Sequence, residues 1–304
     1  MRRSLLILRR ASAPWQTNGT WSIIGSSLVN TPTLGSELVT NGDMESGSPP
    51  SSWTATGTST LTSVSDESTG GSGTKSLNAL RGTTDNSAFQ NVTVAVGTWY
   101  QFNGWLRNVD ATNAQYQMNL TGSPSGTFAT VTGTSWVNQI SVFKITATGG
   151  NIRCLVSTSG NGRFDRVSLK PLTLNTLMAV RQGVADPASI SATITQTFPC
   201  VAGVIVNLDS LSNPQNFVLG VHNGGSTAHL IKCVGGTYTN VLSNSVAFSA
   251  GATIEVRKTA SSTYQLWYGG SQRGADQTIS DAGVISNTLH GVFSTQAGTT
   301  LVMT

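Results

Sequence analysis

The stretch Thr98-Trp99-Tyr100-Gln101-Phe102-Asn103-Gly104-Trp105-Leu106-Arg107 decides the fold, because its side chains alternate between two kinds. Tyr100, Phe102 and Leu106 share one parity and suit a hydrophobic core. Side chains two residues apart line one face of a strand, so the other parity forms a second, polar face. That face carries Gln101, Asn103, Trp105 and Arg107. Asn-Gly also signals a hairpin turn, but the alternation continues on both sides of it, so we expect one strand.

The composition favours short strands over helices. Charged residues make up only 10% of the 304 residues, whereas soluble domains usually contain roughly 25%. No window places apolar residues at the spacing of an amphipathic helix. A hydrophobic content of 38% and a net charge of +4 argue against disorder. The chain has room for two domains of roughly 150 residues each.

Regular short strands separated by turn residues predict an all-β chain with two antiparallel β-sandwiches. We expect an N-terminal extended arm at residues 1–36, in which Trp15 to Ile24 forms a hairpin turning on Asn18-Gly19. The first sandwich is expected at 37–170, a linker at 171–187, and the second sandwich at 188–304.

Two sequence motifs bound the first sandwich. Asn41-Gly42-Asp43-Met44-Glu45 opens it and Phe164-Asp165-Arg166-Val167-Ser168-Leu169 closes it. Together with the central strand, and with Trp136 ahead of Phe143, they resemble the jelly-roll carbohydrate-binding modules of the family 4/9 type over about residues 38 to 170. Met44 stands where that family usually has Phe, and Arg166 stands where a second Asp is usual.

The second sandwich resembles concanavalin A-like or laminin-G-like domains. The segments that carry this resemblance are Ala202-Gly203-Val204, Asn216-Phe217-Val218-Leu219, Gly236-Thr237-Tyr238 and His290-Gly291-Val292-Phe293-Ser294. Such a domain paired with a jelly-roll module is similar to appendage and tail proteins of bacteriophages.

The polar face of the central stretch is a candidate glycan-binding site, because a flat ring flanked by amide and guanidinium groups suits a sugar ring. We expect Trp105 to stack on the sugar. Hydrogen bonds are expected from Gln101, Asn103, Arg107, Gln115 and Gln117, all on one sheet face. The alternative is that Trp105 packs under a loop.

Glu45 and Asp165 are the candidate metal ligands. Asp165 shares parity with Val167 and Leu169, so its side chain is expected to point toward the core, where an unpaired carboxylate costs several kcal/mol. The resemblance implies a structural calcium ion at the two carboxylates, since calcium takes several oxygen ligands. The alternative is that Asp165 accepts backbone N–H bonds or pairs with Arg163 or Lys75.

Other functional classes find little support in the sequence. There is no zinc-protease, Walker A or serine-hydrolase motif, so we expect a non-catalytic protein. Lysine and arginine are scattered without a nucleic-acid-binding stripe, and no apolar run is long enough to span a membrane. Cys154, Cys200 and Cys233 fit small buried thiols, while a bond between Cys200 and Cys233 is the alternative.

The N-terminus imitates a secretory signal, with Arg2-Arg3, Leu5 to Leu8 and Ala11-Ser12-Ala13, but four apolar residues are fewer than such signals use. We therefore expect residues 1–36 to anchor the chain to virion proteins or to other copies in a homo-oligomer. The leading hypothesis is a glycan-binding appendage on a virion surface. The alternatives are a purely structural decoration protein and a secreted bacterial polysaccharide-binding protein.

Overall fold

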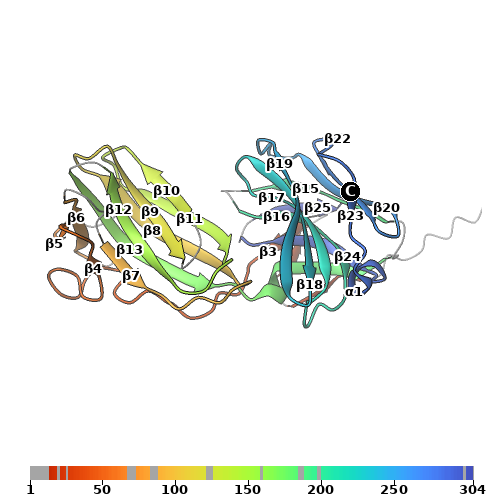
Figure 1. Ribbon diagram of the computed structural model, residues 1–304, viewed down its shortest axis with the longest axis horizontal. Coiled ribbons are helices and arrows are strands. Elements are labelled where there is room, and N and C mark those ends of the chain that lie inside the picture. Colours follow the sequence, from red (N-terminus) through yellow and green to blue (C-terminus); the bar gives the residue numbers. More distant parts are fainter. Residues whose placement is uncertain are drawn as a thin grey trace, which may run out of the picture.

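In the computed structural model the chain forms two β-sandwiches that lie end to end along its long axis (Figure 1). The described residues are 14–18, 21–24, 27–66, 73–82, 88–120, 126–157, 160–183, 188–196, 200–296 and 299–303. Within these ranges every strand pairing is antiparallel, and helix is limited to η1 (Leu174–Leu177) and α1 (Ala282–Ile285). The predicted all-β class is confirmed.

The first sandwich consists of two five-stranded sheets. Its strands are β4 (Thr54–Ala55), β5 (Thr60–Val64), β6 (Ser76–Leu80), β7 (Ala88–Asn91), β8 (Trp99–Asn108), β9 (Asn113–Leu120), β10 (Gly126–Val131), β11 (Val137–Lys144), β12 (Gly150–Ser157) and β13 (Asn161–Pro171). One sheet has the order β11-β8-β13-β6-β5, and the other has the order β10-β9-β12-β7-β4.

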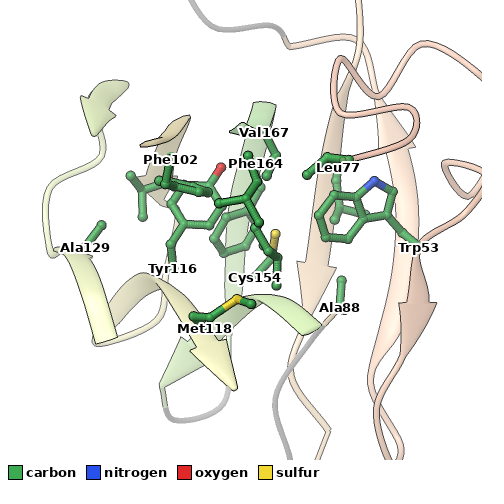
Figure 2. Close-up of a cluster of buried hydrophobic side chains, with 14 of the residues drawn as sticks. Trp53, Leu77, Ala88, Phe102, Tyr116, Met118, Ala129, Cys154, Phe164 and Val167 are labelled. Carbon is green, nitrogen blue, oxygen red and sulfur yellow. The ribbon is translucent and has the colours of Figure 1, made fainter. Parts of the chain in front are cut away.

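Aromatic rings from both sheets fill the core between them (Figure 2). The Tyr116 ring lies 4.8 Å from the Phe102 ring and 5.4 Å from the Phe164 ring, measured between centroids. A Cβ atom at Gly104 would lie 2.9 Å from both the Phe102 and Tyr116 rings, so this strand position requires glycine. The Asn103-Gly104 pair therefore continues strand β8 instead of turning it, as predicted.

The opening and closing motifs of the first sandwich lie against each other. The Val167 N–H donates to the Gly42 carbonyl at 2.8 Å, and a Cβ atom at Gly42 would lie 1.9 Å from the Val167 carbonyl oxygen. Met44 is fully buried and belongs to the hydrophobic core of the first sandwich. The contact explains why glycine follows Asn41 in the opening motif.

The second sandwich also consists of two sheets. Its strands are β1 (Gln16–Thr17), β2 (Trp21–Ile24), β3 (Ser27–Asn30), β14 (Met178–Gln182), β15 (Ala188–Thr195), β16 (Ala202–Leu208), β17 (Phe217–His222), β18 (Thr227–Val234), β19 (Thr237–Ser245), β20 (Thr253–Ala260), β21 (Thr263–Tyr268), β22 (Ser271–Gln272), β23 (Gln277–Thr278), β24 (Leu289–Ser294) and β25 (Thr300–Met303). The sheet orders are β1-β14-β24-β16-β17-β18-β19 and β2-β3-β25-β15-β20-β21-β22, with β23 beside β21.

The prediction of a separate arm is wrong for residues 14–18, 21–24 and 27–30. Strand β3 pairs with β25, and the Asn30 side chain donates to the Ser294 carbonyl at 2.7 Å. Trp21 and Leu28 are buried in the core of the second sandwich. These strands extend the edges of both sheets of the second sandwich, so the first sandwich is an insertion between β3 and β14. The four arginines at the start of the predicted arm lie outside the described residues.

Two further details of that region also differ from the prediction. The expected hairpin on Asn18-Gly19 is wrong, because β1 and β2 belong to opposite sheets and β2 pairs with β3. The expected linker at 171–187 contains β14, which pairs with β24 in the second sandwich. Short strands with alternating side chains share the same local sequence pattern, whichever sheet they join.

The two sandwiches share a buried apolar cluster. Trp99 and Leu172 pack against the outer face of the seven-stranded sheet, where the Trp99 ring lies 5.7 Å from the Phe293 ring. Strands β16 and β17 are buried along their whole length. The two segments that connect the sandwiches also hydrogen-bond to each other, since the Thr173 N–H donates to the Thr33 carbonyl at 3.1 Å. The inserted sandwich thus covers a face that would otherwise be exposed and apolar.

The three cysteines are buried free thiols, which confirms that interpretation over the disulfide alternative. Among the described residues no helix has the length and apolar character needed to cross a membrane.

Candidate functional site

Strand β8 presents two distinct faces, as the alternation predicts. Its inward side chains are buried, while Gln101, Asn103, Trp105 and Arg107 are half-buried on the outer face of the sheet. Trp105 is partly exposed there. These four residues therefore lie in one row on one sheet face.

Gln115 and Gln117 do not lie on that face, and their predicted place is corrected. They belong to β9, which pairs with β10 and β12 in the opposite sheet. Their partner Tyr116 points into the core, so the two glutamines face outward on the far side of the sandwich. Strand β9 follows β8 in sequence, but the chain crosses to the other sheet between them.

The neighbour of β8 is β11, which contributes two residues that the sequence reasoning did not place in the site. Asn138 is the register partner of Trp105, and Trp136 precedes the strand on the same side. The Arg107 guanidinium lies 5.6 Å from the Trp136 ring centroid. Trp136 and Asn138 alternate around Val137, and this period of two is the sequence signal that places both side chains on one face of the strand. We call the surface formed by Gln101, Asn103, Trp105, Arg107, Trp136 and Asn138 the Trp105 face.

Two guanidinium groups and one carboxylate form an ion cluster beside Trp136. Asp66 forms salt bridges with both Arg107 and Arg163, and Arg107 also donates to the Thr134 carbonyl at 3.2 Å. Partial burial lowers the pKa of Arg163. One carboxylate against two guanidinium groups leaves one positive charge, and the cluster fixes the Arg107 side chain next to the Trp136 ring.

Several polar atoms on and beside the Trp105 face are buried and have no hydrogen-bond partner among the described residues. They are Asn103 Oδ1, Arg107 Nε, Trp136 Nε1 and Arg163 Nε. Buried polar groups are normally paired, and an unpaired one costs about 1–3 kcal/mol. Their concentration at one place shows that the hydrogen-bonding capacity of this part of the sheet is not fully used among the described residues.

Both candidate metal ligands, Glu45 and Asp165, accept hydrogen bonds from N–H donors. Glu45 Oε1 accepts from the Thr74 and Lys75 amides at 2.7 and 2.8 Å. Burial alone would raise the pKa of Glu45, but these N–H donors outweigh it, and the pKa lies below its ordinary value. The Lys75 ammonium donates to the Glu45 carbonyl at 3.2 Å.

Asp165 is buried, but a bulge in β13 separates it from Val167 and Leu169, so the strand parity on which its prediction rested does not hold; Arg166 is one of its partners. The Arg166 amide donates to Asp165 Oδ1 at 2.8 Å, and the Arg166 Nε atom lies 3.8 Å from Oδ2. Within the described residues no three His, Cys, Asp or Glu side chains are grouped as metal ligands. Cationic groups of Lys75 and Arg166 beside the carboxylates do not fit a calcium ion. The backbone N–H alternative describes Asp165 better, with Arg166 in place of Arg163 or Lys75.

The Trp105 face ends where the two sandwiches meet. Gln101 donates to the Gln296 side chain of the second sandwich at 3.0 Å. Beyond it lies a groove of about 290 Å³ between the sandwiches, which we call the interdomain groove. The first sandwich contributes Trp99, Val142 and Lys144 to its wall, and the second contributes Asn223, His229 and Asn240. The groove lies outside the set of residues predicted from the sequence.

Neither a protein-family model nor a curated protein matches the sequence. Among solved structures, the CBM22-1 xylan-binding domain of Paenibacillus barcinonensis Xyn10C is similar at 13% identity and a TM-score of 0.37, over 47% of this chain and 96% of that chain. The CBM22-1-CBM22-2 tandem domain of the same protein is similar at 10% identity and a TM-score of 0.39, over 90% and 98%.

The enzymatically active domain of tailspike protein 4 from bacteriophage CBA120 is similar at 18% identity and a TM-score of 0.35, over 44% of this chain and 21% of that chain. At TM-scores this low, the similarities assign neither a family nor a function. The carbohydrate-binding domains named are of the CBM22 type, so the 4/9 type stays a prediction from the sequence.

Proposed function

We propose that this chain is a non-catalytic carbohydrate-binding protein that holds a glycan on the Trp105 face. The observation that carries the proposal is the half-buried Trp105 side chain on an outer sheet face, with Asn103 on its own strand and Asn138 opposite it on β11. A rigid aromatic side chain supplies apolar contact area at low entropic cost. The amide groups on both strands supply hydrogen-bond donors and acceptors for sugar hydroxyl groups.

The Trp105 face is held in place before any ligand arrives. Arg107 is fixed by Asp66 and by the Thr134 carbonyl, and it packs beside Trp136. Fixing a long side chain in advance reduces the conformational entropy that binding would otherwise lose. A sheet face with two tryptophans and anchored polar groups therefore favours recognition of an extended, polar chain.

The same geometry favours binding over hydrolysis. Glycosidases flank the scissile bond with two carboxyl groups roughly 5 to 9.5 Å apart. The carboxylate of Asp66 contacts Arg107 and is shared between two guanidinium groups. A carboxylate engaged in this way is poorly suited to act as a nucleophile or to carry a catalytic proton.

The biological setting that we propose is a bacteriophage appendage that attaches to polysaccharide from the virion surface. The support is the resemblance of the two sandwiches, in sequence, to phage appendage proteins. Residues 1–13, with Arg2, Arg3, Arg9 and Arg10, would then contact virion proteins or other copies of the chain in a homo-oligomer.

A polysaccharide array tests the proposed function. The purified chain should bind a subset of immobilised glycans and should release no reducing ends from them. Binding to none would favour a purely structural decoration protein, and release of sugar would contradict the non-catalytic assignment. Mass spectrometry of purified particles against culture medium then separates a virion protein from a secreted bacterial one.

A further inference from the structure

The interdomain groove continues the Trp105 face along the same two strands. On β8 the outward row runs from Trp105 through Asn103 and Gln101 to Trp99. On β11 it runs from Asn138, the partner of Trp105, to Lys144, the partner of Trp99. Six residues of strand span about 20 Å at the usual rise per residue. The Gln101–Gln296 contact closes the row on β8, so a glycan chain from Trp105 would reach the groove along β11.

The groove is lined by both apolar and polar side chains. Its apolar lining includes Val142 of the first sandwich and Val221 and Ile231 of the second. Among the polar lining residues, His229 Nδ1 lies 3.0 Å from the Ser243 hydroxyl oxygen, and the Asn240 amide donates to the same hydroxyl at 2.7 Å. Mixed walls of this kind, with a few fixed polar groups, are typical of small-ligand sites.

Lys144 brings a positive charge into the groove without a carboxylate partner. Its Nζ atom lies 3.7 Å from the centroid of the Tyr238 ring. Lys170 and Lys232 have carboxylates within 4 Å, whereas none of the described carboxylates forms a salt bridge with Lys144. Buried cations are normally paired, because removing them from water without a counter-ion is unfavourable.

The other titratable groups around Lys144 do not supply a second charge at neutral pH. Burial lowers the pKa of Lys144 to about 8, with a smaller opposing effect from Cys233, so the ammonium remains largely protonated at pH 7. Burial lowers the pKa of His229, which favours the neutral imidazole. Burial raises the pKa of the Cys233 thiol to about 12, so it stays protonated. The groove therefore carries a net positive charge.

We propose that the interdomain groove binds an acidic group of the glycan, with Lys144 as its counter-ion and the second sandwich completing the site. The ligand class is a polysaccharide bearing carboxylate, sulfate or phosphate groups. This inference rests on the proposed function, because the same chain would lie across the Trp105 face. It assigns the second sandwich a direct part in recognition.

The test compares acidic glycans with matched uncharged forms. An array carries polygalacturonate and alginate beside their carboxyl-reduced forms, and heparan sulfate beside its desulfated form, together with a wide range of neutral polysaccharides. A phosphorylated glycan beside its dephosphorylated form tests phosphate, the third kind of acidic group. The proteins are the full-length wild type, Lys144→Met, Lys232→Met and Trp105→Ala. Lys232→Met is the matched control, because it removes one positive charge that is already paired with Asp281.

We expect the wild type to bind at least one acidic glycan about tenfold more tightly than its uncharged form, the usual size of a charge-assisted hydrogen bond. Lys144→Met should abolish this preference, Lys232→Met should keep it, and Trp105→Ala should weaken binding to both forms by at least about tenfold. Lys144→Met should melt close to the wild type, because the lost contact with the Tyr238 ring is offset by removal of the cost of partly burying an ammonium group. Equal binding of charged and uncharged forms, or a preference that survives Lys144→Met, would overturn the groove assignment and leave the proposed function intact. Binding to no glycan would overturn both.

Discussion

The indole N–H of Trp21 donates a hydrogen bond to the backbone carbonyl of Thr176 at 3.1 Å, across 155 positions of sequence. The two residues flank the inserted first sandwich on its N-terminal and C-terminal sides. Trp21 is also part of the core of the second sandwich. The contact therefore ties both crossing segments to the sandwich that receives the insertion.

The first prediction concerns this closure. Trp21→Ala should destabilise the second sandwich by about 3–5 kcal/mol, because it removes a buried aromatic side chain and leaves a cavity. Ile24→Ala on the same strand is the control. Its side chain is 65% exposed, so the change should stay within about 0.5 kcal/mol.

Hydrogen exchange shows which strands lose stability in Trp21→Ala. Trp21→Ala should increase amide exchange in β15 and β25 and leave β8 protected, because the first sandwich has its own core. Deleting residues 14–30 should have the same effect in a stronger form. Unchanged protection of β25 in both proteins would show that the N-terminal strands are dispensable.

The second prediction concerns calcium. Because N–H donors and cationic groups already occupy Glu45 and Asp165, a chelator should leave the melting temperature of the first sandwich unchanged. A ligand that binds only the folded state would raise that temperature by mass action. A drop on chelation, reversed by added calcium, would restore the metal site that the family resemblance implies.

The third prediction is a pH dependence at Glu45. Its pKa in the folded state lies below the ordinary value of 4.5, so its contribution to stability is present above that value. The contribution is lost as the pH falls through the lower folded value. Glu45→Gln should therefore reduce stability at pH 7 and flatten its decline in acid. The free energy of unfolding from urea titrations at several pH values measures this, and parallel curves for both proteins would contradict it.

The fourth prediction concerns the ion cluster. Asp66→Asn should destabilise the first sandwich by about 1 kcal/mol and weaken glycan binding, since it leaves Arg107 and Arg163 without their counter-ion. Asp281→Asn is matched in chemistry and exposure, at 30% against 28%, but it breaks a single surface pair with Lys232. Asp281→Asn should change neither the stability of the first sandwich nor glycan binding. Equal effects of the two changes would show that the cluster has no special role.

The sequence predicted the fold class and the two faces of β8, because alternation with period two is a local property. It did not predict which sheet each strand joins. Gln115 and Gln117 alternate as regularly as Asn103 and Trp105, yet the chain crosses to the opposite sheet between β8 and β9. A shared period cannot show which strands are neighbours.

Long-range partners explain the remaining differences. The Trp15 to Ile24 segment has the pattern of a lone hairpin, but Gln16–Thr17 pairs with β14 more than a hundred residues away and Trp21–Ile24 pairs with β3. Trp136 shows the opposite case. Its alternation with Asn138 was visible in the sequence, but only the register with β8 places it beside Arg107.

Binding of the wild type, Trp105→Ala and Gln117→Ala to one glycan tests the central claim most directly. Any glycan that the wild type binds on the array is measured with all three proteins by isothermal titration calorimetry, and their melting temperatures are compared. Trp105→Ala should lose at least about tenfold in affinity, since stacking on a tryptophan is a dominant contact in such sites. Gln117→Ala, on the opposite sheet, should bind as the wild type does. Unchanged affinity in Trp105→Ala, or a loss in Gln117→Ala alone, would contradict the assignment of the glycan to the Trp105 face.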